Sequence, residues 1–192
     1  MYNSPGRRGG SAWPADVRAR RVPADLHEGS HRDFLRRHER ESADAARQTA
    51  RQRTEFARCL FRRAADPRNL RCALDHLALE GGSAPGPDGL TLDELDGAER
   101  WELVRALGGM IRSGLYRPGP HREVQIPKGP GRGTRTLRIR NVEDRVVERA
   151  IVQVVQPFLD PTFAPTSFGY RPGRGREHAL AHAEAIADRT GS

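Results

Sequence analysis

The strongest constraint on the fold is a stretch of alternating residues in the second half of the chain. Residues 121–128 alternate, with Val124 and Ile126 on one face, and after the turn GPGRG the run RTLRIR alternates again, with Leu137 and Ile139 on the inward face. Two segments of period 2 that flank a glycine-rich stretch are typical of an antiparallel β-hairpin. We therefore expect a hairpin whose apolar face packs inward and whose tip is basic and glycine-rich.

The rest of the chain has helical patterns. Apolar residues at helical spacing predict helices over about 31–65, 68–80, 99–113, 142–157 and 177–188. Asp66 is the expected N-cap of the second helix, Gly81 and Gly82 its end, and Pro157 the end of the fourth. Together these elements predict an α+β fold in which the hairpin extends a small antiparallel sheet with helices on one side.

Three regions are expected along the chain. Residues 1–30 are rich in Gly, Pro, Ser and Arg without periodicity, which predicts a disordered basic arm. Residues 31–66 are mostly charged and predict a basic helical extension, of which only the C-terminal end can pack well. Residues 67–192 contain the hairpin and the remaining helices.

The charge is large and unevenly distributed. The 192 residues include 33 Lys and Arg against 25 acids, a net charge of +8. Residues 1–63 hold fifteen Arg against eight acids, residues 64–116 five against nine, and residues 117–149 nine Lys or Arg against four. Two basic blocks around an acidic one favour a polyanionic partner. A solvated, Arg-rich surface with no such partner is the alternative.

Several classes of protein receive no support from the sequence. Cys59 and Cys72 are too few for a disulfide framework, so a reducing cytoplasmic compartment is expected. The chain has no apolar run of about 20 residues, which predicts no membrane span. Its seven histidines show neither metal spacing nor paired carboxylates, so satisfied or surface roles are expected for them.

The hairpin tip is the most informative candidate site. Backbone amides of a glycine-rich turn can approach an anion closely, and Lys128, Arg132 and Arg135 stand around it. Lys128 is also the only lysine among the 33 basic residues. A compact ammonium at this position suits phosphate, although an exposed turn kept soluble by its charge would have the same composition.

The residues from about Arg68 to Asp188 resemble the finger motifs of group II intron reverse transcriptases and maturases. In that family the motifs run Ile-Pro-Lys, a glycine-rich turn and Arg-Pro-Leu, then Asp-Arg-Val-Val, then Ser-Tyr-Gly-Phe-Arg-Pro-Gly-Arg. Here IPKGPGRGTRTLRIR, DRVV and SFGYRPGR follow in the same order, and APGPDGLTLDEL resembles the segment upstream of them. The resemblance implies that residues 67–192 form a fingers-type domain.

The resemblance also implies roles for single residues. Lys128 and Arg135 match the positions that contact the triphosphate of the incoming dNTP. The segment Ala84–Gly89 and the Arg-Pro-Gly-Arg loop match positions along template or primer backbone. The nucleic-acid contacts that we expect are Pro87, Asp88, Gly89, Arg132, Arg138, Arg140, Arg171, Gly173 and Arg174. Phe168 and Tyr170 are expected either to pack in the core or to stack on a base.

The sequence also departs from the family. RTLRIR stands where the family has Arg-Pro-Leu-Gly-Ile-Pro, so Thr136, Arg138 and Arg140 replace two prolines and a glycine. In the family the catalytic carboxylates lie beyond the position of Asp188, so no catalytic residue and no metal ligand is expected here.

We therefore expect the N-terminal part of an RNA-directed DNA polymerase, which binds RNA or an RNA-DNA primer-template and clamps the dNTP. Alone it would be inactive, and the complete enzyme would use Mg²⁺. The alternatives are a non-enzymatic RNA-binding module and a truncated reading frame without a function of its own. The pattern does not predict an oligomeric state.

Overall fold

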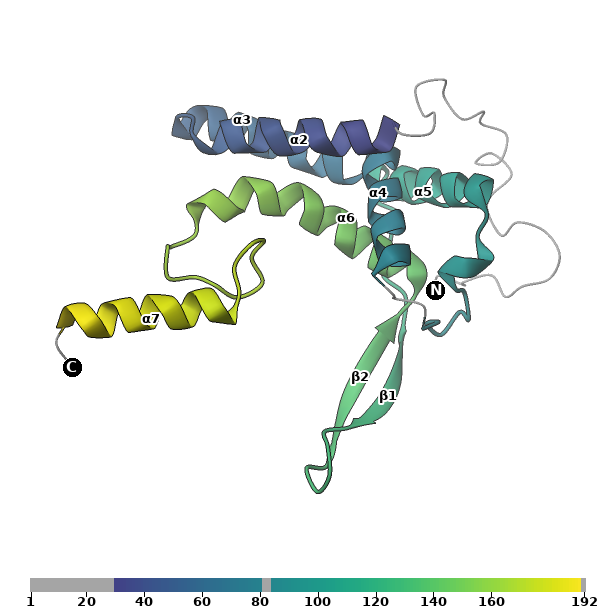
Figure 1. Cartoon of the computed structure of the whole chain (residues 1–192). Helices are drawn as coiled ribbons and strands as arrows, with labels where there is room; N and C mark the ends of the chain where they lie inside the picture. The colour runs from purple at the N-terminus through teal and green to yellow at the C-terminus, as the bar shows by residue number, and fades with distance from the viewer. Residues whose placement is uncertain (1–29, 81–83, 191–192) are drawn as a thin grey trace.

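The computed structural model describes residues 30–80 and 84–190 of the chain (Figure 1). The predicted basic arm and the two glycines at 81 and 82 lie outside these ranges, apart from Ser30. In chain order the helices and strands are α2 (Ser30–Ala46), α3 (Ala50–Ala64), α4 (Pro67–Leu79), α5 (Gly97–Arg112), β1 (His121–Pro127), β2 (Thr134–Arg140), α6 (Val142–Leu159) and α7 (Arg176–Thr190). Short 3₁₀ helices span Leu92–Glu94 (η1) and Asp160–Thr162 (η2). The fold is α+β, as predicted.

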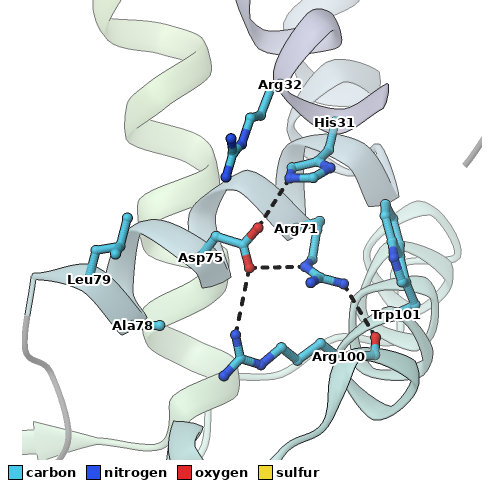
Figure 2. A pocket seen from close by; sticks show the side chains of 9 residues that line it. His31, Arg32, Arg71, Asp75, Ala78, Leu79, Arg100 and Trp101 are labelled. Atoms are coloured by element: carbon cyan, nitrogen blue, oxygen red, sulfur yellow. Dashed lines mark hydrogen bonds and ion pairs between the residues drawn. The ribbon is translucent and has the colours of Figure 1, made fainter. Parts of the chain in front are cut away.

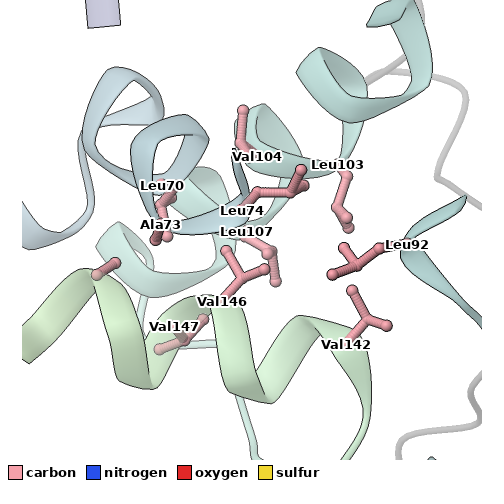
Figure 3. Packing of buried hydrophobic residues seen from close by; sticks show 11 residues of the cluster. Leu70, Ala73, Leu74, Leu92, Leu103, Val104, Leu107, Val142, Val146 and Val147 are labelled. Carbon is pink, nitrogen blue, oxygen red and sulfur yellow. The ribbon is translucent and has the colours of Figure 1, made fainter. Parts of the chain in front are cut away.

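The hydrophobic core lies between α4, α5 and the N-terminal half of α6 (Figure 3). These helices contribute aliphatic side chains that are at most 1% exposed, and η1 adds Leu92. The fully buried larger members are Leu70, Leu74, Leu103, Val104, Leu107, Val142 and Val146. All of them come from the helical stripes of the sequence, so the pattern identified the core of this body correctly.

Local signals set the ends of the central helices. Asp66 is the N-cap of α4, as predicted, and accepts a hydrogen bond from the backbone N–H of Arg68, with Pro67 in the first turn. Asp96 and Glu99 form a capping box at the start of α5. The prediction that Pro157 ends α6 was wrong, because the helix continues to Leu159. A proline so close to the end removes one backbone hydrogen bond without breaking the helix.

The single helix predicted over residues 31–65 is two helices. α2 and α3 lie side by side, and α2 packs on α4 and α6 (Figure 1). Thr49 begins α3 with a capping box to Gln52, which stops α2 and lets the chain reverse. The packing prediction was also wrong. α2 buries His31, His38 and other residues, whereas α3 has no buried residue.

The hairpin stands apart from the helices and contacts them only near its base (Figure 1). β1 and β2 form a two-stranded antiparallel sheet in which Val124 faces Leu137 and Ile126 faces Arg135. The predicted alternation is therefore correct, but its inward face is not buried. Leu137 is 46% exposed, and Val124 and Ile126 are half-buried. No further strand among the described residues extends this sheet, which corrects the larger sheet expected from the sequence.

Candidate nucleic-acid interface

The base of the hairpin is held by a polar network around the start of α6. Asp144 is 3% exposed and accepts hydrogen bonds from the Tyr116 hydroxyl at 2.5 Å and the Gly119 backbone N–H at 3.0 Å. Burial and this bond raise the pKa of Tyr116 above its usual value. Because Tyr116 and Gly119 precede β1, Asp144 ties the entry of the hairpin to α6. A carboxylate in the first turn of a helix is also stabilised by the helix dipole.

The APGPDG segment is the second element at this base. Gly86 is buried against Asn141, and a Cβ at Gly86 would lie 2.4 Å from Asn141 Oδ1. Arg122 on β1 donates to the Pro85 carbonyl at 2.9 Å, and Arg145 on α6 donates to the Ala84 carbonyl at 3.1 Å. Only glycine allows the segment to approach so closely. The segment therefore joins the hairpin to the helical body.

Pro87, Asp88 and Gly89 lie on the outer part of this segment. Pro87 and Gly89 are exposed. Asp88 accepts a hydrogen bond from the Leu90 backbone N–H at 3.2 Å, and burial raises its pKa. The structure thus gives Asp88 a local role in the turn. Pro87 and Gly89 face solvent, and their contact with a nucleic acid stays a prediction.

The tip is a tight turn surrounded by unneutralised cations. Lys128 N–H donates to the Gly133 carbonyl at 2.9 Å, and Arg132 N–H donates to the Gly129 carbonyl at 3.2 Å. The side chains of Lys128, Arg132 and Arg135 are exposed, and none has a hydrogen bond or ion pair with a described residue. In water such charges cost little, so they are available to a phosphate.

The arginines of β2 lie on both faces of the hairpin. Arg135 shares its face with Ile126 and Leu137, because directly paired residues and their second neighbours project to the same side. Arg138 and Arg140 lie on the other face. Each has a surface partner there. Arg138 contacts Glu123 at 3.1 Å, and Arg140 contacts Glu148 at 2.8 Å. The hydrogen bond from Arg138 lowers the pKa of Glu123.

The Arg-Pro-Gly-Arg loop contains the one predicted contact whose side chain is buried. Arg171 has a side chain that is 5% exposed and binds Asp160 through two nitrogens, at 2.7 and 3.1 Å. It also donates to the carbonyls of Asp160, Ala164 and Ser167. These bonds lower the pKa of Asp160. A guanidinium engaged in this way holds the loop together, and it would have to break these bonds to bind a phosphate.

The other predicted residues of this loop are open to solvent. Arg174 and Gly173 are exposed, and Arg174 donates one hydrogen bond to the Pro165 carbonyl at 2.8 Å. Tyr170 is fully exposed and has a positive φ of 57°, which a bulky residue rarely adopts. Phe168 packs against the ring of His182 instead. The two aromatic residues therefore differ, and only Tyr170 is free to stack.

These residues do not form a single site. The hairpin base lies at the start of α6 and the Arg-Pro-Gly-Arg loop lies beyond its end (Figure 1). An 18-residue helix is about 27 Å long at 1.5 Å per residue. The predicted contacts therefore lie along an extended surface rather than around a cavity. That spacing suits a polymer with many phosphates better than a small molecule.

Across residues 30–80 and 84–190, no three His, Cys, Asp or Glu side chains are grouped so that they could hold a metal ion. None of the helices in these ranges is long and apolar enough to span a membrane.

Comparison with known proteins confirms the resemblance seen in the motifs. No protein-family model matches the chain. Over 104 residues, 54% of the chain, it is 36% identical to Protein YkfC of Escherichia coli. Over 92 residues, 48% of the chain, it is 28% identical to the Group II intron-encoded protein LtrA of Lactococcus lactis. Over 92 residues, again 48% of the chain, it is 32% identical to an uncharacterized 91 kDa protein in the cob intron of Schizosaccharomyces pombe.

The match to LtrA relates about half of the chain to a group II intron-encoded protein, the class that the motifs indicated. The three matches cover 27%, 15% and 11% of the relatives. The chain thus spans about a quarter or less of the curated proteins it matches. The similarity therefore supports a shared region, while activities of the whole relatives come to this chain only as proposals.

Proposed function

We propose that this chain is the fingers part of an RNA-directed DNA polymerase of the group II intron type. It binds the backbone of RNA or of an RNA-DNA primer-template, and its hairpin tip contacts the triphosphate of the incoming dNTP. The observation that carries the proposal is the set of three unneutralised cations, Lys128, Arg132 and Arg135, around a glycine-rich turn held away from the helical body. Chemistry would require Mg²⁺ in the complete enzyme, and a cytoplasmic location fits the free cysteines.

The backbone-binding role rests on charge spread over several elements. Exposed arginines line α2 and α3, and others lie on the hairpin and at Arg174. On α2, residues Arg32, Arg36 and Arg40 follow one another at intervals of four, so they lie on one stripe of the helix. Arginine at such positions contacts phosphates without reading base edges. We therefore expect binding that depends on charge and is indifferent to sequence.

Salt dependence tests that role directly. If about six phosphates are neutralised, affinity should fall about a thousandfold between roughly 50 and 200 mM salt. The measurement is fluorescence anisotropy of labelled RNA and of a labelled RNA-DNA duplex at several salt concentrations. A flat response, or a strong preference for one sequence at constant salt, would contradict a backbone-binding surface.

The nucleotide role is tested with single variants of the tip. Lys128→Ala and Arg135→Ala each remove one charge-assisted contact to phosphate, which is worth about 1.5 to 3 kcal/mol. Binding of a labelled dNTP should therefore weaken about ten- to hundredfold. Affinity for the primer-template should change little, because many other cations contribute to it.

Arg189→Ala is the matched control, since this exposed arginine near the end of α7 is remote from the tip. It removes the same unit of charge and should leave dNTP binding unchanged. If the tip variants instead lose primer-template binding and keep dNTP binding, the tip belongs to the backbone surface. If neither binding changes, the tip is only an exposed turn.

A further inference from the structure

A second cationic site lies on the helical body, where α2, α4 and α5 meet (Figure 2). It is an open pocket of about 610 Å³. The chemistry-bearing residues on its wall are His31, Arg32, Arg71, Asp75, Arg100 and Trp101. None of them belongs to the hairpin, to the APGPDG segment or to the Arg-Pro-Gly-Arg loop. The motifs of the sequence gave no sign of this pocket.

Two of its guanidinium groups are held in place by bonds to backbone. Arg71 contacts Asp75 at 3.0 Å and donates to the Gly97 carbonyl at 3.3 Å. Arg100 donates to the carbonyls of Leu95 at 3.1 Å and Leu92 at 3.3 Å. Its remaining terminal nitrogen lies 3.8 Å from Asp75. Because these groups are already ordered, binding an anion costs little further side-chain entropy.

The third arginine has no such bonds. Arg32 is exposed at the first turn of α2, and its side chain has no hydrogen bond or ion pair with any described residue. The pocket therefore contains three guanidinium groups and one carboxylate, that of Asp75, which leaves an excess of two positive charges. An anion bound here would meet planar donors from more than one direction.

His31 adds a polar group that needs a partner. Its side chain is 6% exposed, and its Nε2 faces the Asp75 carboxylate at 3.1 Å. Its Nδ1 is buried and has no hydrogen-bond partner in the described part of the chain. Buried polar atoms are usually paired, and on a neutral ring whose Nε2–H faces Asp75 the Nδ1 atom is an acceptor that needs a donor. Burial lowers the pKa of His31 although Asp75 opposes this.

We propose that this pocket binds a phosphate group. A phosphate oxygen can accept from Arg32 and from the free nitrogens of Arg71 and Arg100, and its charge offsets the excess of cations. The phosphate could come from the backbone of an RNA strand or from a free phosphorylated molecule. The stripe of Arg36 and Arg40 that continues from Arg32 favours the RNA backbone.

Trp101 provides a direct readout. Arg71 lies over its ring at 5.0 Å, and the His31 ring meets it edge-on at 5.9 Å. An anion that moves either group will change the fluorescence of Trp101. The chain has two tryptophans, so Trp13→Phe leaves Trp101 as the only one.

The experiment titrates this single-tryptophan protein with inorganic phosphate at constant ionic strength, with chloride as the balancing anion. We expect a saturable change in fluorescence. Arg32→Gln should weaken the affinity about tenfold, the usual effect of losing one charge-assisted contact. Arg189→Gln is the matched control, since this exposed arginine near the end of α7 lies outside the pocket, and it should stay within about twofold. No saturable response, or equal losses in both variants, would overturn the proposal.

A second titration with a short RNA oligonucleotide identifies the source of the phosphate. If the oligonucleotide binds at least about tenfold more tightly per phosphate, and Arg32→Gln weakens both ligands, the site takes an RNA backbone. If it binds no more tightly than inorganic phosphate, the site takes a free phosphorylated molecule. Arg32 is exposed, so its variant should fold normally. If the fluorescence response to phosphate is absent while the tip variants still weaken dNTP binding, the phosphate proposal for the pocket is wrong and the proposed function is unaffected.

Discussion

The hairpin and the helical body both contain aliphatic side chains, but only the body buries them fully. The body buries its aliphatic residues between α4, α5 and α6, and Leu74 there is fully buried. The hairpin has aliphatic residues at the correct period, yet Leu137 is 46% exposed. A two-stranded hairpin without a covering layer is only marginally stable in water. The hairpin therefore depends on the contacts at its base, and its outer half is free to serve binding.

The arginines show the same contrast. Arg171 is buried in its loop and satisfied by Asp160 and by backbone carbonyls. Arg135 projects from the hairpin with no partner among the described residues. A buried guanidinium must be paired, whereas an exposed one need not be. Arginines that resemble each other in the motif thus have different roles, and only the unpaired ones are immediately available to a phosphate.

The largest difference in unfolding free energy should come from a leucine-to-alanine substitution made once in each region. Leu74→Ala removes a fully buried side chain from the core and should lower the free energy of unfolding by about 2 to 5 kcal/mol. Leu137→Ala removes an exposed side chain and should lower it by no more than about 0.5 kcal/mol. Urea unfolding followed by circular dichroism measures both. Similar losses at the two positions would show that the hairpin face is covered in solution.

The second-largest difference between the two regions should appear in how acid changes the free energy of unfolding. His38 is 1% exposed, its Nε2 donates to the Val154 carbonyl at 2.8 Å, and its Nδ1 accepts from Arg63 at 2.9 Å. Burial lowers its pKa below the usual 6.5. As pH falls below that value, the unfolded chain takes up the proton first, so stability is present at neutral pH and is lost on acidification. The slope is at most about 1.4 kcal/mol per pH unit for one histidine.

His38→Gln should therefore reduce the loss of unfolding free energy between about pH 7 and pH 5. Part of the loss will remain, because burial also lowers the pKa of His31. His121→Gln on the hairpin is the control, since its exposed side chain has no buried bond to lose. An unchanged slope in His38→Gln would mean that the α2 contact with α6 does not titrate in this range.

Local structure was predictable where a short pattern determines it. The alternation around Val124 and Leu137, the Asp66 cap and the helical stripes of the core all depend on neighbours in the sequence. The sequence also contains a signal for the break between α2 and α3, because Thr49 and Gln52 have the spacing of a capping box. It was missed because long helix-forming composition on both sides outweighed a single capping signal.

Features that depend on distant partners were not predictable. The alternation of the hairpin indicates an apolar face, but only tertiary structure decides whether anything covers it. Nothing near Arg171 indicates that Asp160, eleven residues away, will bury it. The phosphate pocket joins α2, α4 and α5, whose residues lie far apart in the chain. The role of Gly86 likewise follows only from its approach to Asn141.

The smallest effects should come from glycine-to-alanine changes, which have opposite signs in the two regions. Gly109 lies within α5, and a Cβ there would have no neighbour within 4 Å. Gly109→Ala should therefore raise the free energy of unfolding by up to about 1 kcal/mol, because alanine is the better helix former. Gly131 has a φ of +69° and follows Pro130 in the turn of the tip. That conformation costs alanine about 1 kcal/mol.

The strain that Gly131→Ala introduces should destabilise only the hairpin. Since the tip contacts no helix, its opening does not require the body to unfold. Amide hydrogen exchange of β1 and β2 should then become about fivefold faster, while the urea midpoint stays unchanged. Gly109→Ala should shift that midpoint and leave exchange in the strands as it was. If Gly131→Ala lowers the urea midpoint as well, the hairpin and the body unfold together, and the tip is a rigid extension of the core.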